Sequence, residues 1–352
     1  MQPPDSAVRA WQVTRYGRPS EALELVVVPP PEPRAHEIVV RTSTSVCNYN
    51  EVDGCHGRYL TINPPLPYTL GMEFVGQVIG AGRGAEDWIG RRVMGTGRGA
   101  TGAHAEQVVG PVDMAFDVPA GLDDVEAAAF CYPFHLAHLG LHERAGLQAG
   151  ETVLVHAAAG GVGSAAVQLA VAAGARVIAT AGGPEKLAVA RDLGADVAID
   201  YRAGPFGPAV LEATDGHGVD VCFDGVGGEV MMASLPCLAR NGRHLVVGFA
   251  SGIEAEEVPM VNGRTLCFAN MSLMGVVLAY GDPRRMPPGS GFNVWPRSVA
   301  EAVQGHLVEL LEAGRIRPLV GKTVAFDELP RALDEMEDRA TVGRVVVQIS
   351  GS

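Results

Sequence analysis

The chain of 352 residues lacks closely spaced cysteine pairs, a surplus of positive charge and an apolar signal segment. Its six cysteines are scattered without a Cys-x-x-Cys pair, which favours reduced thiols over a disulfide framework. The net charge of −13 argues against nucleic acid or an anionic membrane as the main partner. The first ten residues contain no apolar core of a signal peptide. We therefore expect a cytoplasmic protein that binds neither nucleic acid nor membrane.

What is present is enough apolar sequence for a large core, at 47% of residues, in a chain long enough for two domains. Over the first 130 residues, short β-like runs alternate with glycine and proline. This pattern predicts a β-rich domain with many turns. The predicted strands cover residues 37–42, 71–79, 92–94 and 105–109.

From about residue 135, predicted strands and helices alternate, which indicates an α/β fold with a doubly wound parallel sheet. The strands cover residues 152–156, 176–180, 196–200, 219–224 and 243–248; the helices cover 161–173, 184–193, 207–214 and 228–239. Residues 281–296 are rich in proline and glycine and predict a loop that leaves this domain. A helix near 297–313 and a strand at 343–349 are predicted to return to the first domain. The expected division is therefore 1–134 with 281–352, and 135–280.

The most informative stretch is residues 152–170, a short β-branched run followed by a glycine turn and a helix. The turn places Ala158, Gly160 and Gly163 in the G-x-G-x-x-G frame, with alanine first and with Gly161 and Val162 between the last two glycines. A turn of this kind brings backbone N–H groups and the positive end of a helix against a pyrophosphate. Its strand and helix context predicts a dinucleotide-binding site, and its glycines argue against the membrane span that hydropathy alone suggests.

The end of the second strand of this domain predicts which dinucleotide binds. NAD-binding folds commonly place an acidic residue there, but this chain has Thr180 and Ala181. A carboxylate would repel a 2′-phosphate, whereas Lys186, one turn into the next helix, would attract it. We expect Glu185 to point to solvent. The sequence therefore favours NADPH over NADH.

Several segments along nearly the whole chain resemble the zinc-free quinone oxidoreductase branch of the medium-chain dehydrogenase/reductase superfamily. They are residues 48–53, 57–59, 64–78, 155–163, 186–196, 223–228 and 338–346. The resemblance implies a GroES-like catalytic domain formed by both chain ends and a central Rossmann domain. It also implies NADPH-dependent reduction of quinones or other α,β-unsaturated carbonyls, usually by homodimers.

The positions that hold zinc in related alcohol dehydrogenases carry different residues here. Asn48 stands at the cysteine position, and the Gly-His-Glu triplet reads Gly71-Met72-Glu73. Neither asparagine nor methionine is a usual zinc ligand, and the four cysteines of the structural zinc lobe are missing. Cys55 and His56 lack a matching second pair. The trio His135, His138 and His142 is interpreted as packing or surface histidines. We expect no metal.

Without a metal, hydrogen-bond donors must stabilise the negative charge that develops on the substrate oxygen. The resemblance places Asn48 and Tyr59 at positions that line the nicotinamide cleft, with Tyr49 as a weaker candidate. The final proton comes either from Tyr59 or from water. By position, the cofactor contacts are the glycine turn with Thr180, Lys186, Tyr201, Gly225, Val226, Phe249 and Arg339.

Two other functions stay open at this point. One is reduction of enoyl thioesters, for which Arg284, Arg285 and Arg297 could supply a basic patch. The other is cofactor binding without catalysis. Two departures from the family concern the cleft: Leu136-Ala137 replaces Thr-Ala, and residues 130–134 are bulkier than usual. The segment 281–296 looks like an insertion. The apolar segment 265–279 is predicted to pair across a homodimer axis.

Overall fold

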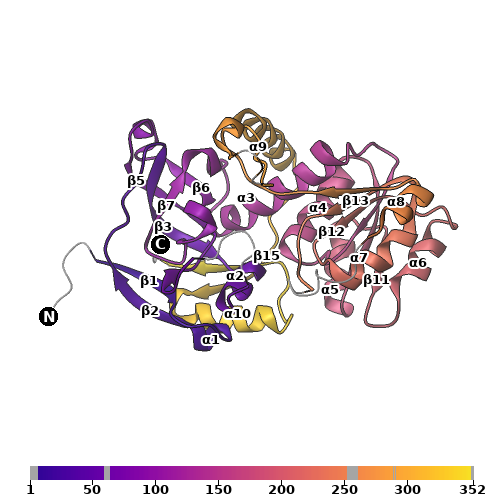
Figure 1. Ribbon diagram of the computed structural model, residues 1–352, viewed down its shortest axis with the longest axis horizontal. Coiled ribbons are helices and arrows are strands. Elements are labelled where there is room, and N and C mark those ends of the chain that lie inside the picture. Colours follow the sequence, from indigo (N-terminus) through magenta and orange to yellow (C-terminus); the bar gives the residue numbers. More distant parts are fainter. Residues whose placement is uncertain (1–6, 59–63, 252–260, 288, 290, 350–352) are drawn as a thin grey trace. The chain divides into compact units, whose positions relative to one another are not determined.

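The computed structural model describes residues 7–58, 64–251, 261–287, 289 and 291–349. The chain divides into two compact units. The first unit comprises residues 1–131, 280–283 and 318–352, and the second comprises 132–279 and 284–317. Helix α3 (Asp124–His138) carries the chain from the first unit into the second (Figure 1). Among the described residues, no helix has the length and apolar character needed to cross a membrane.

The first unit is built on β-sheets. One sheet runs in the order β15-β16-β3-β5-β6-β8, with β7 also paired to β3, and a smaller sheet runs β2-β1-β4. The strands are β1 (Val8–Val13), β2 (Leu23–Val28), β3 (Glu37–Val46), β4 (Tyr68–Thr69), β5 (Glu73–Ala81), β6 (Arg92–Thr96), β7 (Gln107–Pro111), β8 (Ala115–Asp117), β15 (Val320–Ala325) and β16 (Arg344–Gln348). The helices are α1 (Pro19–Ala22), α2 (Tyr49–Cys55) and α10 (Leu329–Glu337).

The C-terminal strand β16 joins this unit because it pairs antiparallel with β3, with Val346 opposite Val46. Three of its residues, Val345, Val346 and Val347, are almost completely buried. A run of β-branched residues favours a strand that is covered on both faces. The two chain ends therefore share one sheet, as the sequence predicts.

The second unit is a parallel six-stranded sheet in the order β11-β10-β9-β12-β13-β14. In chain order this is the 3-2-1-4-5-6 arrangement of a dinucleotide-binding fold. The strands are β9 (Thr152–Val155), β10 (Arg176–Ala181), β11 (Val197–Asp200), β12 (Val219–Asp224), β13 (Leu238–Val246) and β14 (Ser272–Gly275). The helices are α4 (Gly161–Ala172), α5 (Pro184–Asp192), α6 (Phe206–Ala213), α7 (Gly228–Ser234), α8 (Gly263–Ala269) and α9 (Arg297–Glu312). The predicted fold class is confirmed.

Helix α9 lies in a different unit from the one expected. The sequence assigned all of residues 281–352 to the first domain, whereas residues 284–317 belong to the second unit. His135 of α3 bonds Gln304 of α9 at 2.9 Å, and Arg315, just after α9, donates to the Ala172 carbonyl at 3.1 Å. These tertiary contacts decide the assignment, and the local sequence pattern does not contain them.

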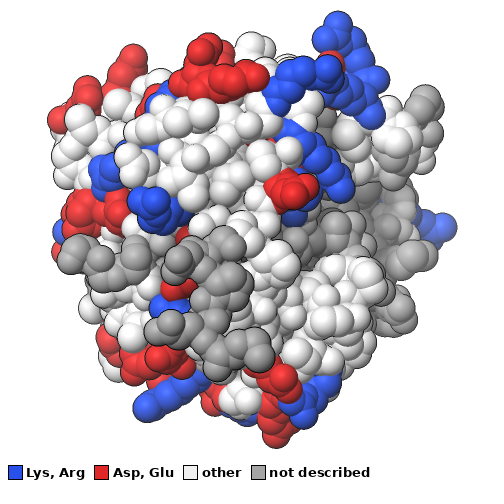
Figure 2. All heavy atoms as spheres, turned by 90° about the vertical axis from the view of Figure 1, so that its left-hand side faces the viewer, with Lys and Arg blue, Asp and Glu red and all other residues white. Residues whose placement is uncertain are grey.

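Charged side chains of both signs appear on the face drawn in Figure 2, separated by broad uncharged areas. Basic side chains gather at the upper right of this face, and acidic side chains lie near them. The distribution agrees with the net charge of −13.

Candidate functional site

The glycine turn of the second unit begins at the end of β9. Ala157 has a positive φ of 51°, and Gly160 precedes α4 in an extended conformation. A Cβ at Gly163 would lie 2.3 Å from the Ala157 carbonyl oxygen, so this position requires glycine. The Ala158 N–H donates to the Thr180 carbonyl at 3.1 Å, which fixes the turn to β10. With no acidic residue in its first turn, α4 presents unneutralised N–H groups suited to an anion.

Below this turn lies a buried network centred on His156. The Ser234 hydroxyl donates to the Val230 carbonyl, so it accepts from His156 Nε2 at 2.8 Å. His156 Nδ1 then accepts from the Thr180 hydroxyl at 2.8 Å. Burial lowers the pKa of His156 to about 4, so the ring is neutral at pH 7. The Thr180 side chain, 2% exposed, is therefore hydrogen-bonded inside the protein and stabilises the turn.

The end of β10 gathers a second group of polar residues. Gly182 and Gly183 form the turn into α5, whose third residue is the half-buried Lys186. A Cβ at Gly182 would lie 2.7 Å from the Tyr201 hydroxyl and 2.8 Å from Arg202 Nε. Both side chains therefore lie across the turn. Sequence analysis found Lys186 and Tyr201 but missed Arg202, whose place directly after Tyr201 and β11 was an available signal.

Asp200, at the end of β11, stabilises this arrangement through the backbone. Its Oδ1 accepts from the Gly183 N–H at 3.2 Å and from the Arg202 N–H at 2.9 Å. The carboxylate is thus used to shape the turn between two strands. It brings the Arg202 main chain toward the Gly182-Gly183 turn.

The loops after β12 and β13 complete the carboxyl edge of the sheet. Asp224 Oδ1 accepts from the N–H groups of Val226 and Gly227 at 2.7 and 3.0 Å. Burial alone would raise the pKa of Asp224, but the His244 ring and these backbone groups outweigh it and hold the pKa below its usual value. The Gly225 carbonyl accepts from the Ala250 N–H at 3.1 Å, beside the 40% exposed Phe249. The two loops are therefore held together at the predicted positions.

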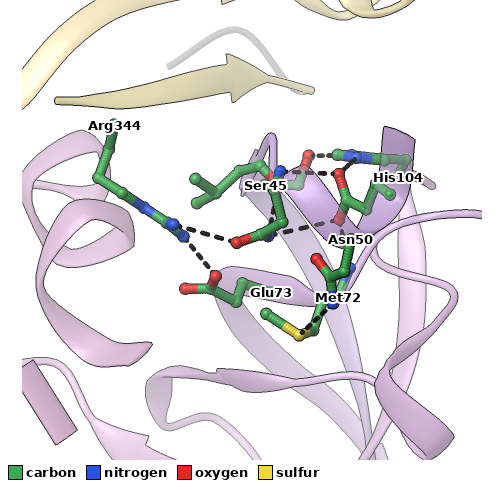
Figure 3. A network of polar contacts seen from close by, with 9 residues as sticks. Ser45, Asn50, Met72, Glu73, His104 and Arg344 are labelled. Carbon is green, nitrogen blue, oxygen red and sulfur yellow. Dashed lines mark hydrogen bonds and ion pairs between the residues drawn. The ribbon is translucent and has the colours of Figure 1, made fainter. Parts of the chain in front are cut away.

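The first unit contains a separate buried polar network around Asn48 (Figure 3). Asn48 stands directly before α2 and is 7% exposed. Its amide nitrogen donates to the Val46 carbonyl at 3.2 Å and to Glu51 Oε1 at 3.4 Å. Its amide oxygen accepts from Arg344 Nη1 at 3.0 Å. Both hydrogens of the Asn48 amide are thus directed at protein acceptors.

Glu51 connects α2 to the start of β5 and to a buried histidine. Its carboxylate accepts from the Met72 N–H at 2.8 Å and from the Asn48 N–H at 3.1 Å. His104 Nε2 lies 2.9 Å from Glu51 Oε2, and His104 Nδ1 lies 2.7 Å from the Ser45 hydroxyl. Glu51, His104 and Ser45 are all 0% exposed. These contacts form one buried hydrogen-bond network that joins α2 to the start of β5 and to His104.

Arg344 and Glu73 form a buried ion pair on the other side of Asn48. Their exposed fractions are 6% and 3%. Burial raises the pKa of the Glu73 carboxyl, and the Arg344 guanidinium opposes that rise. Glu73 Oε2 and Arg344 Nε are buried without a hydrogen-bond partner in the described part of the protein.

The positions at which zinc was considered hold no cluster suited to a metal. Met72 Sδ accepts from Asn50 Nδ2 at 3.6 Å, and His138 of the histidine trio bonds His306 at 2.9 Å. Among the described residues, no three His, Cys, Asp or Glu side chains are placed to hold a metal ion. Tyr59 lies outside the described residues. Arg339 follows α10 in the first unit with a positive φ of 56°.

Comparisons with known proteins match both parts of the chain. Residues 34–120 match the family described as alcohol dehydrogenase GroES-like domain, and residues 161–290 match the zinc-binding dehydrogenase family. A quinone oxidoreductase-like protein 2 homolog from Nematostella vectensis is 34% identical over 313 residues, which are 88% of this chain and 81% of the relative.

Two further similar proteins are a structure that contains NADPH and a much longer synthase. A mycobacterial protein solved in complex with NADPH has a TM-score of 0.84 at 31% identity, covering 97% of this chain and all of that one. The phthioceranic/hydroxyphthioceranic acid synthase of Mycobacterium tuberculosis is 38% identical over 220 residues. These residues are 62% of this chain but 10% of the synthase.

Proposed function

Because the chain belongs to the quinone oxidoreductase branch of the medium-chain dehydrogenase/reductase superfamily, we propose that it is an NADPH-dependent reductase of quinones or α,β-unsaturated carbonyls that works without zinc. The observation that carries the proposal is the turn at Gly182. There Tyr201 and Arg202 converge at the end of β10, beside Lys186 in the next helix.

The residues of the second unit fit a dinucleotide. Gly163 leaves its Cβ position empty beside the Ala157 carbonyl, which keeps the turn tight enough for a pyrophosphate to reach the start of α4. The loops that carry Gly225, Val226 and Phe249 border the crevice at the carboxyl edge of the sheet, where ligands of such folds bind. Thr180 holds the turn through its carbonyl, which accepts from the Ala158 N–H, and through its hydroxyl, which donates to His156.

The same unit favours a 2′-phosphate. Arg202 offers a guanidinium and Tyr201 a hydroxyl at one glycine turn, and Lys186 is the third residue of the helix that follows. Arginine binds phosphate with charge-assisted hydrogen bonds. Asp200, whose Oδ1 accepts two backbone N–H groups, adds one negative charge here, and the two cations of Arg202 and Lys186 outnumber it.

Titration with NADPH and NADH tests this site. We expect the wild type to bind NADPH far more tightly than NADH. Arg202→Ala and Lys186→Ala should each reduce this difference in affinity between the two cofactors. Arg191→Ala, at the exposed far end of α5, is the control and should leave the difference in affinity unchanged. Arg339→Ala is titrated in the same series, because the sequence assigns Arg339 a further cofactor contact. Equal affinities of the wild type for the two cofactors would refute the proposed site.

The chemistry needs no metal at the Asn48 network. A bound NADPH supplies a hydride, and the protein must then stabilise the negative charge that collects on the substrate oxygen. Asparagine and methionine, at positions 48 and 72, are poor zinc ligands, so this charge falls to hydrogen-bond donors. Tyr59 keeps the donor role that the sequence predicts, and Tyr59→Phe tests it through kcat.

A second substrate class is favoured by the 38% identity with a segment of the mycobacterial synthase. An enoyl thioester is also an α,β-unsaturated carbonyl and needs the same donor for its oxygen. A panel of quinones, enones and enoyl-CoA esters separates the classes by kcat/KM. Absence of turnover with every member would favour a cofactor-binding protein without catalysis.

We also propose a homodimer through β14. This strand ends the sheet and pairs with β13 on one side, and one of its carbonyls, that of Gly275, accepts from Arg144. Phe268, Leu273 and Val277 on the same segment are 78%, 38% and 39% exposed. An exposed strand edge with apolar neighbours is suited to pairing with a second copy.

A further inference from the structure

We propose that Arg344 is a catalytic residue whose Nε–H donates to the substrate oxygen, and that Asn48 and Glu73 are positioning residues that hold its guanidinium. This inference rests on the proposed reductase function. It replaces the role that the sequence suggested for the Asn48 amide.

The side-chain amide of Asn48 is already bonded within the protein. Its amide nitrogen donates to Val46 and Glu51, and its oxygen accepts from Arg344. A primary amide has two N–H donors. Both are directed at acceptors within the protein, so a substrate oxygen would have to displace one of these bonds.

Arg344, in contrast, has a side-chain N–H donor that no described residue accepts. A guanidinium carries five N–H donors and keeps its charge at any pH relevant to enzymes. Nη1 donates to Asn48 Oδ1 and Nη2 to Glu73 Oε1, while the buried Nε has no partner in the described residues. Leaving a buried donor unpaired is costly, which favours an acceptor that arrives with a ligand.

The guanidinium of Arg344 is held in one orientation by its contacts. Arg344 is the first residue of β16, and its N–H donates to the Leu319 carbonyl at 2.9 Å. Figure 3 shows its side chain reaching from the strand toward Glu73 and the Asn48 network. Contacts at both terminal nitrogens, Nη1 and Nη2, hold the orientation of the guanidinium before a substrate binds. Such preorganised donors are effective in stabilising a developing oxyanion.

The reaction balances with this donor. In an enone, a hydride adds to the β-carbon, the carbon–carbon π electrons move toward the carbonyl, and the negative charge on oxygen is met by Arg344 Nε–H. A proton from water or Tyr59 then completes the product. In a quinone, one hydride and one proton give the hydroquinone. Glu73 Oε2, also unpartnered, is an acceptor for a product hydroxyl.

The test uses Arg344→Met and the double variant Arg344→Met/Glu73→Gln, which removes both buried charges and so avoids stranding one of them. We expect kcat with a quinone and with an enone to fall by roughly 10²–10³, as for loss of an oxyanion donor. The dissociation constant for NADPH should stay unchanged. Arg41→Met, an exposed arginine on β3 in the same unit, is the matched control and keeps full activity.

Two readouts separate catalysis from structure. Guanidinium ion added to Arg344→Ala should restore part of kcat, and 4-nitrophenol bound to the wild type should show its phenolate band at lower pH than when bound to Arg344→Met. A rise in the NADPH dissociation constant with kcat unchanged at saturation would overturn the proposal, because Arg344 would then hold the cofactor. Wild-type activity retained in both variants would also overturn it. A wild type without turnover would instead refute the reductase function.

Discussion

Replacing Gly182 by alanine tests the proposed phosphate site without removing any charged group. The new Cβ would lie 2.7 Å from the Tyr201 hydroxyl and 2.8 Å from Arg202 Nε, closer than real contacts of this kind. Both neighbours are the far ends of flexible side chains, so they shift and the fold stays intact. Gly182 therefore controls where the two side chains lie.

The magnitude follows from the bond that the shift would weaken. A hydrogen bond to a charged group contributes about 1.5–3 kcal/mol, which corresponds to a roughly ten- to hundredfold weaker binding of NADPH. NADH lacks the 2′-phosphate, so its dissociation constant should hardly change. The assay is a fluorescence titration with each cofactor, accompanied by a thermal melt.

Gly204→Ala is the control, because a Cβ at that nearby glycine meets nothing within 4 Å. It should leave both dissociation constants and the melting temperature unchanged. Unchanged NADPH binding by Gly182→Ala would refute the assignment of Tyr201 and Arg202 to the phosphate. An equal loss for both cofactors would refute it as well, because the effect would then concern the turn itself.

Three other outcomes are expected. His156 has a folded-state pKa of about 4, so between pH 6.5 and 4 the unfolded chain binds a proton at this residue that the native chain does not. This residue alone should lower the free energy of unfolding by roughly 3 kcal/mol as the pH falls through this window, beside the contributions of His135 and His138, so denaturant unfolding of His156→Gln should show a shallower fall. In Gly163→Ala, the Cβ meets the Ala157 carbonyl oxygen at 2.3 Å, and because backbone cannot yield cheaply we expect a lower melting temperature and at least a roughly tenfold weaker binding of NADPH; wild-type values for both would contradict the tight turn. Phe268→Glu should shift the protein from dimer to monomer in light scattering, whereas a wild type that is already monomeric at micromolar concentration would contradict the β14 interface.

The parallel sheet and its glycine turn could be predicted because their signals are local. Apolar runs, glycines after helices and the G-x-G-x-x-G frame lie within a few residues of each other, and most strands and helices of this sheet lie near the predicted ranges. The predicted helix 228–239 is too long, because α7 ends at Ser234 and β13 begins at Leu238. The predicted strands at 37–42 and 92–94 extend to β3 and β6. The strands β1 and β2, which pair with each other, and β4, which pairs with β1, were missed.

The site in the first unit could not be predicted beyond its individual residues. Asn48 and Arg344 are 296 residues apart in sequence, and Glu73 and Arg344 are 271 apart. Nothing local to residue 48 reveals that its amide is bonded on both sides, or that Arg344 keeps an unpartnered Nε. Arg202 differs, because its place directly after Tyr201 was a signal in the sequence, although its approach to Gly182 crosses a strand pair.

Metal-free reduction with NADPH is tested by measuring NADPH oxidation with the quinone, enone and enoyl-CoA panel before and after treatment with a chelator, and by measuring zinc in the same sample. We predict turnover that survives chelation in protein without a stoichiometric equivalent of zinc. One equivalent of zinc together with activity that is lost on chelation would contradict it.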